Sequence, residues 1–537
     1  MTSDRLRSFL FSKTGSITLF GVILLVFVLT PFVRGIDGLP YWFHDHFFNA
    51  VQIAENVRTL GFPTMDSLTP TNDFSPVWTL LLVLFSALTP VQSPLFFGLV
   101  LLALAGSAVL SLYLLNRLIH ILDLPSSPAA VFFTNALFLA MFMRLAITGT
   151  DTVWAVPAVF AMALALFRML RQPSFATGLT CGLSVLIAAA VRFDALGFVL
   201  TGAFVFYMQF NGKTPVTLKE VFRFLPGFML GLLPAAAVLV LGYFTFETPL
   251  PSSLQSWMKV QNIAPWNILT VLFWQPLRYF FRMPTAFALT TIPALTILTA
   301  AYATLPRTPH VQTPKDTVFY TLIWFPIIQL GLFAFFTYMQ LPEYAFYPLC
   351  IGTPFALLYI LDKIDGRLES DAERRQANIF WNILGGLMLL LSLLVVSRPR
   401  IEAYRPVAET VREFARTHPG IYAMGSGAGV SAYLSGMPFV RLDGLAGDHR
   451  IQDYLGQQAA LSRPFLHYGV DYYVAVNLPK GHECYVAREP KENTLGGNNK
   501  GMSDWMCAVP VLSRAASPKI NVMIFAIGPE GKAVNKD

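Results

Sequence analysis

Apolar runs of about 16 to 23 residues, separated by short charged loops, dominate the chain. A helix of about 20 apolar residues matches the hydrocarbon core of a bilayer, where only structures that satisfy their own backbone hydrogen bonds persist. Of the 537 residues, 55% are hydrophobic and 13% are charged, which is about half the charged share of an ordinary soluble domain. We therefore predict a polytopic α-helical membrane protein of about eleven spans. The spans are expected at 16–33, 94–116, 126–145, 152–169, 174–191, 195–210, 224–244, 284–304, 317–336, 345–361 and 378–396.

The basic residues predict how these spans are oriented. Lys and Arg precede the first span and recur in every second loop, whereas the opposite loops are longer and hold fewer of them. Because short cytoplasmic loops carry an excess of Lys and Arg, the N-terminus is expected in the cytoplasm, with 34–92, 245–283 and everything after 397 outside. The net charge of +7 is then a feature of topology, and no nucleic-acid partner is predicted. We expect a multi-pass protein of the bacterial cytoplasmic membrane.

The character of the chain changes after the last apolar run. The tail is polar and mixed, with β-rich runs such as "YYVAV" and "VMIFAIG" and a helical run "RPVAETVREFARTH". We predict a transmembrane domain over 1–397, with a first external loop at 34–92, and an extracytoplasmic soluble α/β domain over 398–537. Cys484 and Cys507 lie in this tail, where an oxidising environment would allow a disulfide, but two cysteines alone do not establish one.

The stretch "GSGAGV", residues 425–430, has some likeness to a nucleotide-binding loop. It lacks the full G-x-G-x-x-G spacing, and it lies in the external tail, where no nucleotide is expected. We predict that it forms a turn between a strand and a helix.

The segment "YWFHDHFFNAVQIAENVRTLGFP", residues 41 to 63, follows directly after the first span. Its apolar residues recur with helical spacing on one face, and polar residues take the other face. An amphipathic helix outside the membrane is expected to lie in the interface plane. Asp45 lies at the start of this helix, flanked by His44 and His46.

Simpler interpretations of these polar residues stay open. Asp45 could cap the helix, which is worth about 1 kcal/mol, and His44 and His46 could be interfacial polar residues. A metal site would need further ligands, and no other His or carboxylate cluster lies nearby in the sequence, so we predict no metal site.

An apolar run of about 13 residues begins at Pro76 and Trp78 and is too short to cross a bilayer. We expect it to be re-entrant or interfacial. The external face would then be built from amphipathic helices packed onto the spans. Such a surface could bind a lipid-linked substrate at the boundary between membrane and water.

Taken together, these segments resemble GT-C membrane glycosyltransferases. "HDHFFNAVQIAENVRTLGFP…DFSPVWTLLL" is similar to the first external loop of that family: an acidic residue after the first span, an amphipathic helix, and a Ser-Pro-aromatic-Trp-like entry to a juxtamembrane helix. The resemblance covers nearly the whole chain and is closest to the arabinosyl- and mannosyltransferase-like subgroup. Four more pieces follow in family order: "ITGTDTVWA" with Asp151, "AAAVRFDALGF" with Arg192 and Asp194, "FETPLPSSLQSWMK" with Lys259, and "YLSGMPFVRLDGLAG".

The resemblance implies a sugar donor carried on a polyprenyl phosphate and a glycan or lipid acceptor, with transfer at the external face. Asp45 would act as general base on the acceptor hydroxyl. Arg192 and Lys259 would offset the charge of the leaving phosphate. His44, His46, Asp151 and Asp194 complete the candidate substrate-binding set.

The chain departs from the family in two places. His44 stands where the family often has a second acid, and "LPEYAFYPL" lacks the family's Arg but has Glu343 nearby. No cofactor is required by this set of residues, and a divalent cation is left open.

Other interpretations of the same residues remain. Arg192 and Asp194 could form only a local ion pair, Lys259 could be an ordinary loop lysine, and Asp151 could cap the following helix. At the level of function, the alternatives are a transporter or flippase of lipid-linked sugars and a non-catalytic protein of cell-envelope assembly. No internal repeat of the kind found in transporters is evident, and the ionisable residues are expected at one membrane face, which favours surface chemistry.

Overall fold

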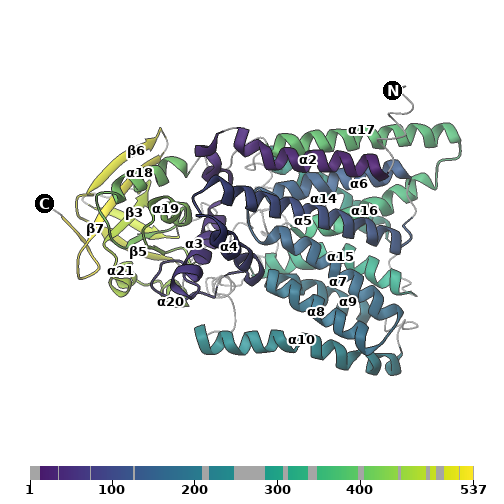
Figure 1. The fold of residues 1–537 in the computed structure, drawn as a ribbon, viewed down its shortest axis with the longest axis horizontal. Helices are drawn as coiled ribbons and strands as arrows, with labels where there is room; N and C mark the ends of the chain where they lie inside the picture. The colour runs from purple at the N-terminus through teal and green to yellow at the C-terminus, as the bar shows by residue number, and fades with distance from the viewer. Residues whose placement is uncertain are drawn as a thin grey trace.

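The computed structural model has a bundle of apolar helices at one end and a mixed α/β region at the other, with two short helices, α3 and α4, between them (Figure 1). It describes residues 13–33, 35–72, 74–124, 127–208, 217–246, 285–305, 313–336, 347–396, 404–444, 449–478, 484–490, 501–518 and 520–535.

Every segment that the sequence predicts to span coincides with a helix. Four helices in the described part of the chain are long and apolar enough to cross a membrane, and several others are shorter. The number of spans and their orientation therefore stay predictions. The bundle helices are α2 (Lys13–Val33), α5 (Pro94–Ile121), α6 (Pro128–Ala146), α7 (Thr152–Arg171), α8 (Phe175–Val191), α9 (Gly197–Met208), α10 (Leu218–Phe246), α14 (Thr285–Thr304), α15 (Pro314–Phe336), α16 (Tyr347–Asp365) and α17 (Asp371–Val396).

A Ser-Pro pair begins several of these helices. The Ser93 hydroxyl accepts a hydrogen bond from the Phe96 amide at 3.1 Å at the start of α5, and Ser127 does the same at the start of α6. Proline at the first helical position lacks only an N–H that has no helical partner there, and the serine satisfies another. The same pair, Ser75 and Pro76, begins α4 (Pro76–Leu88), whose 13 residues match the predicted short apolar run.

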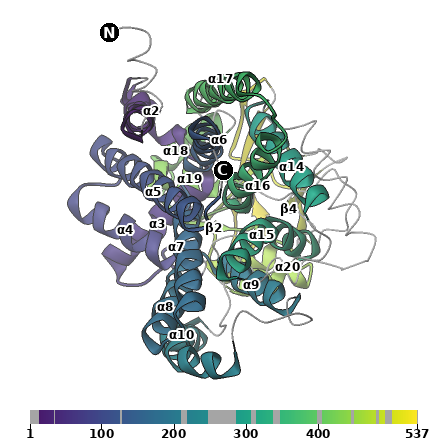
Figure 2. The ribbon, with the colours of Figure 1, turned by 90° about the vertical axis from the view of Figure 1, so that its right-hand side faces the viewer.

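Close packing of α8 against α10 depends on glycine. Gly178 and Gly182 on α8 face Gly227 and Gly231 on α10, so that each helix carries a G-x-x-x-G pair. A Cβ at Gly178 would lie 2.1 Å from the Phe224 carbonyl oxygen. Small residues of this kind let helix backbones approach in a membrane, where the hydrophobic effect does not drive association. Figure 2 shows the two helices side by side at the edge of the bundle.

We expect Gly178→Ala to destabilise the protein although it adds a single methyl group. Overpacking a closed contact costs about 1 to 3 kcal/mol, which outweighs the gain of up to about 1 kcal/mol for Gly to Ala in a helix. Gly106→Ala on α5 is the matched control, since a Cβ there meets no atom within 4 Å. Thermal unfolding of both variants in nanodiscs measures the difference, and equal melting temperatures would contradict the close contact.

The C-terminal region is built around one mixed sheet of strand order β2-β1-β3-β7-β6, with β8 paired to β7. β1 pairs in parallel with β2 and β3, whereas β7 runs antiparallel to β3, β6 and β8. The predicted α/β character of this region is confirmed, and whether it forms a separate domain stays a prediction. Its helices are α18 (Arg405–Ala415), α19 (Ala428–Ser435), α20 (His449–Gly456) and α21 (Ser462–Tyr468). Its strands are β1 (Tyr422–Met424), β2 (Phe439–Arg441), β3 (Tyr472–Val476), β4 (Tyr485–Glu489), β5 (Met502–Met506), β6 (Leu512–Ser517), β7 (Ile520–Ile527) and β8 (Ala533–Val534).

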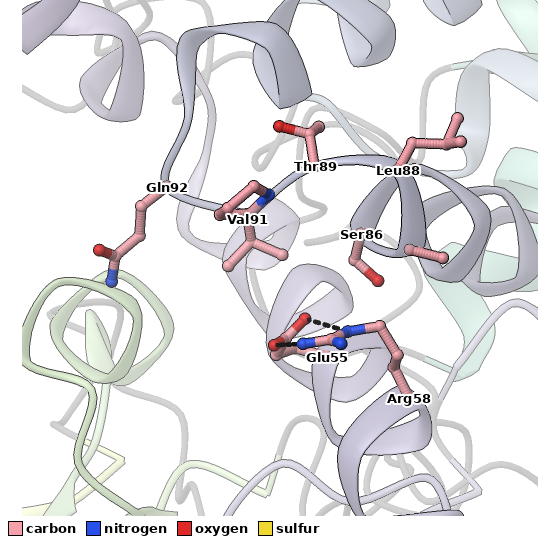
Figure 3. A pocket seen from close by; sticks show the side chains of 9 residues that line it. Glu55, Arg58, Ser86, Leu88, Thr89, Val91 and Gln92 are labelled. Carbon is pink, nitrogen blue, oxygen red and sulfur yellow. Dashed lines mark hydrogen bonds and ion pairs between the residues drawn. The ribbon is translucent and has the colours of Figure 1, made fainter.

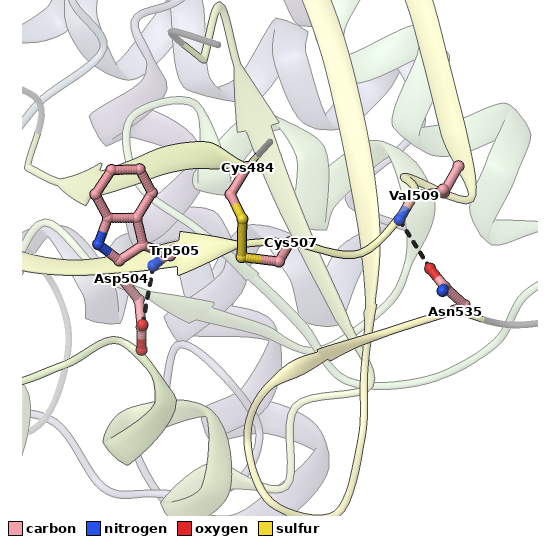
Figure 4. Close-up of a disulfide and its surroundings, with 6 residues drawn as sticks. All are labelled: Cys484, Asp504, Trp505, Cys507, Val509 and Asn535. Carbon is pink, nitrogen blue, oxygen red and sulfur yellow. Dashed lines mark hydrogen bonds between the residues drawn. A yellow bond between two sulfur atoms is a disulfide. The ribbon is translucent and has the colours of Figure 1, made fainter. Parts of the chain in front are cut away.

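The two tail cysteines are joined. Cys484 and Cys507 form a disulfide beside the small sheet of β4 and β5, which stand antiparallel to each other (Figure 4). The bond closes the segment between these strands. This settles the pairing that the sequence alone left open.

Helix α3 (Asp45–Leu60) lies between the bundle and the α/β region, after the short 3-10 helix η1 (Ile36–Trp42). Phe47 and Phe48 belong to the apolar core of the bundle, whereas Ile53 belongs to a core shared with the C-terminal sheet. The amphipathic helix expected after the first span is thus present, and it contacts both parts of the molecule.

Candidate active site

The side chain of Asp45 lies at the junction of the bundle and the α/β region. It is 4% exposed and is the first residue of α3, whereas the N-cap is His44, whose side chain accepts from the His46 amide. The Val430 amide donates to Asp45 Oδ1 at 3.0 Å, and Arg441 Nη1 lies 3.0 Å from Asp45 Oδ2. The interpretation of Asp45 as the helix cap is therefore wrong, because its carboxylate bonds to Val430 and Arg441 of the C-terminal region.

Arg441 at the end of β2 holds this carboxylate from the C-terminal side. Its Nε and Nη2 donate to the two oxygens of Asp443 at 2.7 and 2.9 Å, and its Nη1 also donates to Asn49 Oδ1 at 2.7 Å. Asn49 lies one turn after Asp45 on α3. A guanidinium donates its hydrogen bonds in one plane. The bonds to Asp443 and to Asn49 therefore fix its orientation relative to both the C-terminal region and α3.

The glycine-rich stretch at 425–430 forms the turn from β1 into α19, as predicted from its spacing. Gly427 has a φ of 90°, a conformation that favours glycine. A Cβ on Gly429 would lie 2.3 Å from Asn49 Oδ1 and 3.0 Å from Asp45 Oδ1. The turn brings the Val430 amide, in the first turn of α19, to the Asp45 carboxylate, because Gly429 places no side chain between them.

A second arginine, Arg192, forms an ion-pair cluster at the ends of α7 and α8. Its Nε and Nη2 donate to Asp194 at 2.9 and 2.8 Å, and its Nη1 donates to Asp151 at 3.1 Å and to Thr152 at 3.0 Å. Asp151 occupies the N-cap position of α7 but makes no capping bond. The predicted cap position of Asp151 is therefore found, although its side chain makes no capping hydrogen bond. The interpretation of Arg192 and Asp194 as a merely local pair is wrong, because Asp151 joins them from 41 residues away.

The two clusters share one geometry. In each, an arginine is gripped bidentately by the aspartate two residues later, and its Nη1 reaches an aspartate at the start of a helix elsewhere in the chain. In formal charges, each cluster holds one guanidinium and two carboxylates.

The pKa of His46 is affected by both arginine clusters. Burial, followed by the nearby His44, Arg441 and Arg192, lowers the pKa of His46 well below 6.5. The rings of His44 and His46 stack with centroids 5.0 Å apart. Hydrogen bonds link the two clusters, because the His44 amide donates to the Thr148 carbonyl at 3.4 Å, and the hydroxyls of Thr148, Thr150 and Thr152 form a chain that ends at Arg192. The structure therefore brings together the candidate residues Asp45, His44, His46, Arg192, Asp151 and Asp194.

Some members of this region were missed from the sequence. Tyr347, the first residue of α16, donates to Asp194 at 3.4 Å, and its ring lies 5.7 Å from the Arg192 guanidinium carbon. Arg144, 5% exposed, lies in the last turn of α6, seven residues before Asp151 in the sequence. A charged residue within an apolar run is a functional candidate by default, and that rule would have found Arg144.

Lys259, the second predicted cation, lies outside the described residues, as does Glu343. Among the residues that are described, no group of three or more His, Cys, Asp and Glu side chains is arranged to hold a metal ion.

A separate cleft opens at the far end of α3. It measures about 470 Å³ and is lined by Glu55 and Arg58 and by the turn from α4 to α5 (Figure 3). Glu55 and Arg58 form an ion pair across its floor. With a rise of about 1.5 Å per residue, this cleft begins about 15 Å along α3 from Asp45, so it is distinct from the arginine clusters.

We expect the folded protein to lose stability in acid through His46. The neutral imidazole is favoured in the fold, whereas the unfolded chain takes up the proton near pH 6.5. Stability from this group is therefore complete above that pH and is lost as pH falls below it. His46→Gln should show a smaller drop in melting temperature than wild type between about pH 7.5 and about pH 5.5. His120→Gln, at the opposite end of the bundle, should behave as wild type; a His46→Gln drop equal to wild type would refute this assignment.

A bundle of apolar helices carrying a mixed α/β region, with charged side chains gathered at their junction, is the architecture implied by the GT-C resemblance. The fold of this chain is similar to that of ArnT from Cupriavidus metallidurans. The structure of ArnT from Cupriavidus metallidurans bound to undecaprenyl phosphate matches 87% of this chain and 94% of that chain, with a TM-score of 0.50 and 12% identity.

The apo structure of the same protein matches 86% of this chain and 93% of that chain, with a TM-score of 0.51 and 13% identity. No protein-family model and no curated relative matches the sequence. The two structural matches confirm, at the level of the fold, the resemblance that the sequence predicted.

Proposed function

We propose that the chain is a glycosyltransferase that moves a sugar from a polyprenyl-phosphate carrier to an acceptor hydroxyl at the external face of the cytoplasmic membrane. The observation that carries the proposal is the presence of two arginine–aspartate clusters, one holding Asp45 at the start of α3 and one holding Arg192 at the end of α8. Undecaprenyl phosphate bound to ArnT supports a lipid-phosphate donor for this fold.

Asp45 is the proposed general base. As the acceptor oxygen attacks the anomeric carbon, its proton passes to the Asp45 carboxylate, and the bond between that carbon and the phosphate oxygen breaks. The Val430 amide and Arg441 use two of the roughly four lone-pair sites of the carboxylate.

Arg192 is the proposed partner of the donor phosphate. The leaving phosphate gains negative charge as the sugar departs, and a guanidinium can meet it with two parallel bonds. Asp194 grips Arg192 bidentately, whereas Asp151 lies 3.1 Å from Arg192 Nη1 and is the more exposed aspartate, at 24% against 16%. Asp151 is therefore the partner that we propose the phosphate replaces. Lys259 is proposed as a second cation, and His44 and His46 as contacts to the sugar phosphate. This scheme requires no metal, and activity after chelation tests whether a divalent cation takes part.

Replacing the base with its amide isostere should abolish transfer. Asp45→Asn can still accept from Val430 and Arg441 but takes up no proton, and general-base catalysis contributes about 100-fold or more. The measurement is transfer of radiolabelled sugar from a polyprenyl-phosphate donor in membranes. Glu55→Gln, on the same helix, should retain wild-type activity. Full activity of Asp45→Asn would remove Asp45 from the chemistry, and movement of donor lipid across liposomes without transfer would favour a flippase.

Arg192→Lys should weaken donor binding. The lysine keeps the charge but loses the bidentate geometry, and one charge-assisted hydrogen bond is worth about 1.5 to 3 kcal/mol, so KM for the donor should rise about tenfold or more. Arg171→Lys, at the other end of α7, is the control. An unchanged KM with reduced kcat would assign Arg192 to orientation of the helices instead of to the donor phosphate.

A further inference from the structure

The C-terminal region supplies the groups that hold the Asp45 carboxylate. Val430 donates to one oxygen from a position 385 residues away, and Arg441 bonds the other oxygen. The side chains of Arg441 and Asp45 are 2% and 5% exposed. Charges that are buried this deeply need close partners of opposite charge. If Arg441 and Asp45 were separated, each would be a buried charge without its partner, which is strongly destabilising.

The grip is directional as well as electrostatic. Two bonds to Asp443 fix the guanidinium on its own strand, which leaves Nη1 to point at α3. That single nitrogen meets Asp45 and Asn49, which lie about one helical turn apart. Contact with both residues fixes the rotation of α3 about its axis and, with it, the direction of the Asp45 carboxylate.

Helix α19 closes the contact from the other side. Gly429 leaves no room for a side chain against Asp45 and Asn49. Tyr433, one turn further along α19, donates to the Val91 carbonyl at 2.9 Å and packs its ring 4.9 Å from Phe48. The α/β region is therefore anchored on both the polar and the apolar face of α3.

We propose that the α/β region, through Arg441 and the first turn of α19, is a positioning device for Asp45, so that the active site is complete only when this region is docked on α3. The proposal rests on the proposed function for its catalytic consequence, and its docking part stands independently. Arg441 is a positioning residue that acts through Asp45 and Asn49, while Asp443 orients Arg441.

The test compares Arg441→Gln and Arg441→Lys in the full chain in nanodiscs. Arg514→Gln is the matched control, because Arg514 forms an exposed ion pair with Glu413 in the same region. Hydrogen exchange of peptides over 45–60 and 428–435 reports docking without reference to activity. Transfer kinetics with a polyprenyl-phosphate sugar donor report kcat and KM separately.

We expect Arg441→Gln to raise amide exchange in both peptides about tenfold and to lower kcat about 100-fold, with donor KM changed less than threefold. Arg441→Lys, which keeps the charge without the fork, should fall between it and wild type. Wild-type exchange in Arg441→Gln would overturn the docking. Raised exchange with wild-type kcat would overturn the positioning role. If the wild-type chain transfers no sugar, the proposed function fails, and the docking is still decided by the exchange data.

Discussion

The structure depends on one buried ionic contact, in which Arg441 of the sheet holds Asp45 at the start of α3. Both side chains are almost fully removed from water, and Asp443 and Asn49 complete the set. Taking charges out of water costs several kcal/mol per ion unless good geometry and further hydrogen bonds offset it. Such a contact adds little to net stability compared with an apolar one. Any other arrangement of the α/β region on the bundle would leave these charges buried without their partners. The contact therefore specifies how the α/β region sits on the bundle.

The membrane explains where the remaining charges lie. Apolar helices leave ionisable groups only at their ends, unless partners accompany them into the bundle. Arg192, Asp151 and Asp194 lie at the ends of α7 and α8, and they pair with one another. Tight contacts such as the glycine pairs of α8 and α10 hold the helices close. The position of each helix end, and so of each charged group, follows from this packing.

The sequence predicted the local features and missed the contacts between distant segments. Apolar length predicted the helices, Ser-Pro pairs marked helix starts, and glycine spacing predicted the turn before α19, because each signal lies within a few residues. Asp45 and Arg192 were found through their place beside the apolar runs and through the GT-C resemblance. Arg441 was not assigned a role, because its partner Asn49 lies 392 residues away and no pattern within "VRLDG" identifies that partner. The pairing depends on tertiary packing.

The repeated Arg-x-Asp geometry offers a physical reason for having two arginine clusters. In each, the neighbouring aspartate holds the guanidinium bidentately, which leaves Nη1 for a second carboxylate at a helix start. The two differ in burial: the side chains of Arg441 and Asp45 are nearly inaccessible, whereas those of Arg192 and Asp151 are 13% and 24% exposed. An incoming anion competes more easily for the more exposed pair, since less desolvation is required. The same local motif therefore fits a permanent anchor at Arg441 and the proposed role of Arg192 as an exchangeable anion partner.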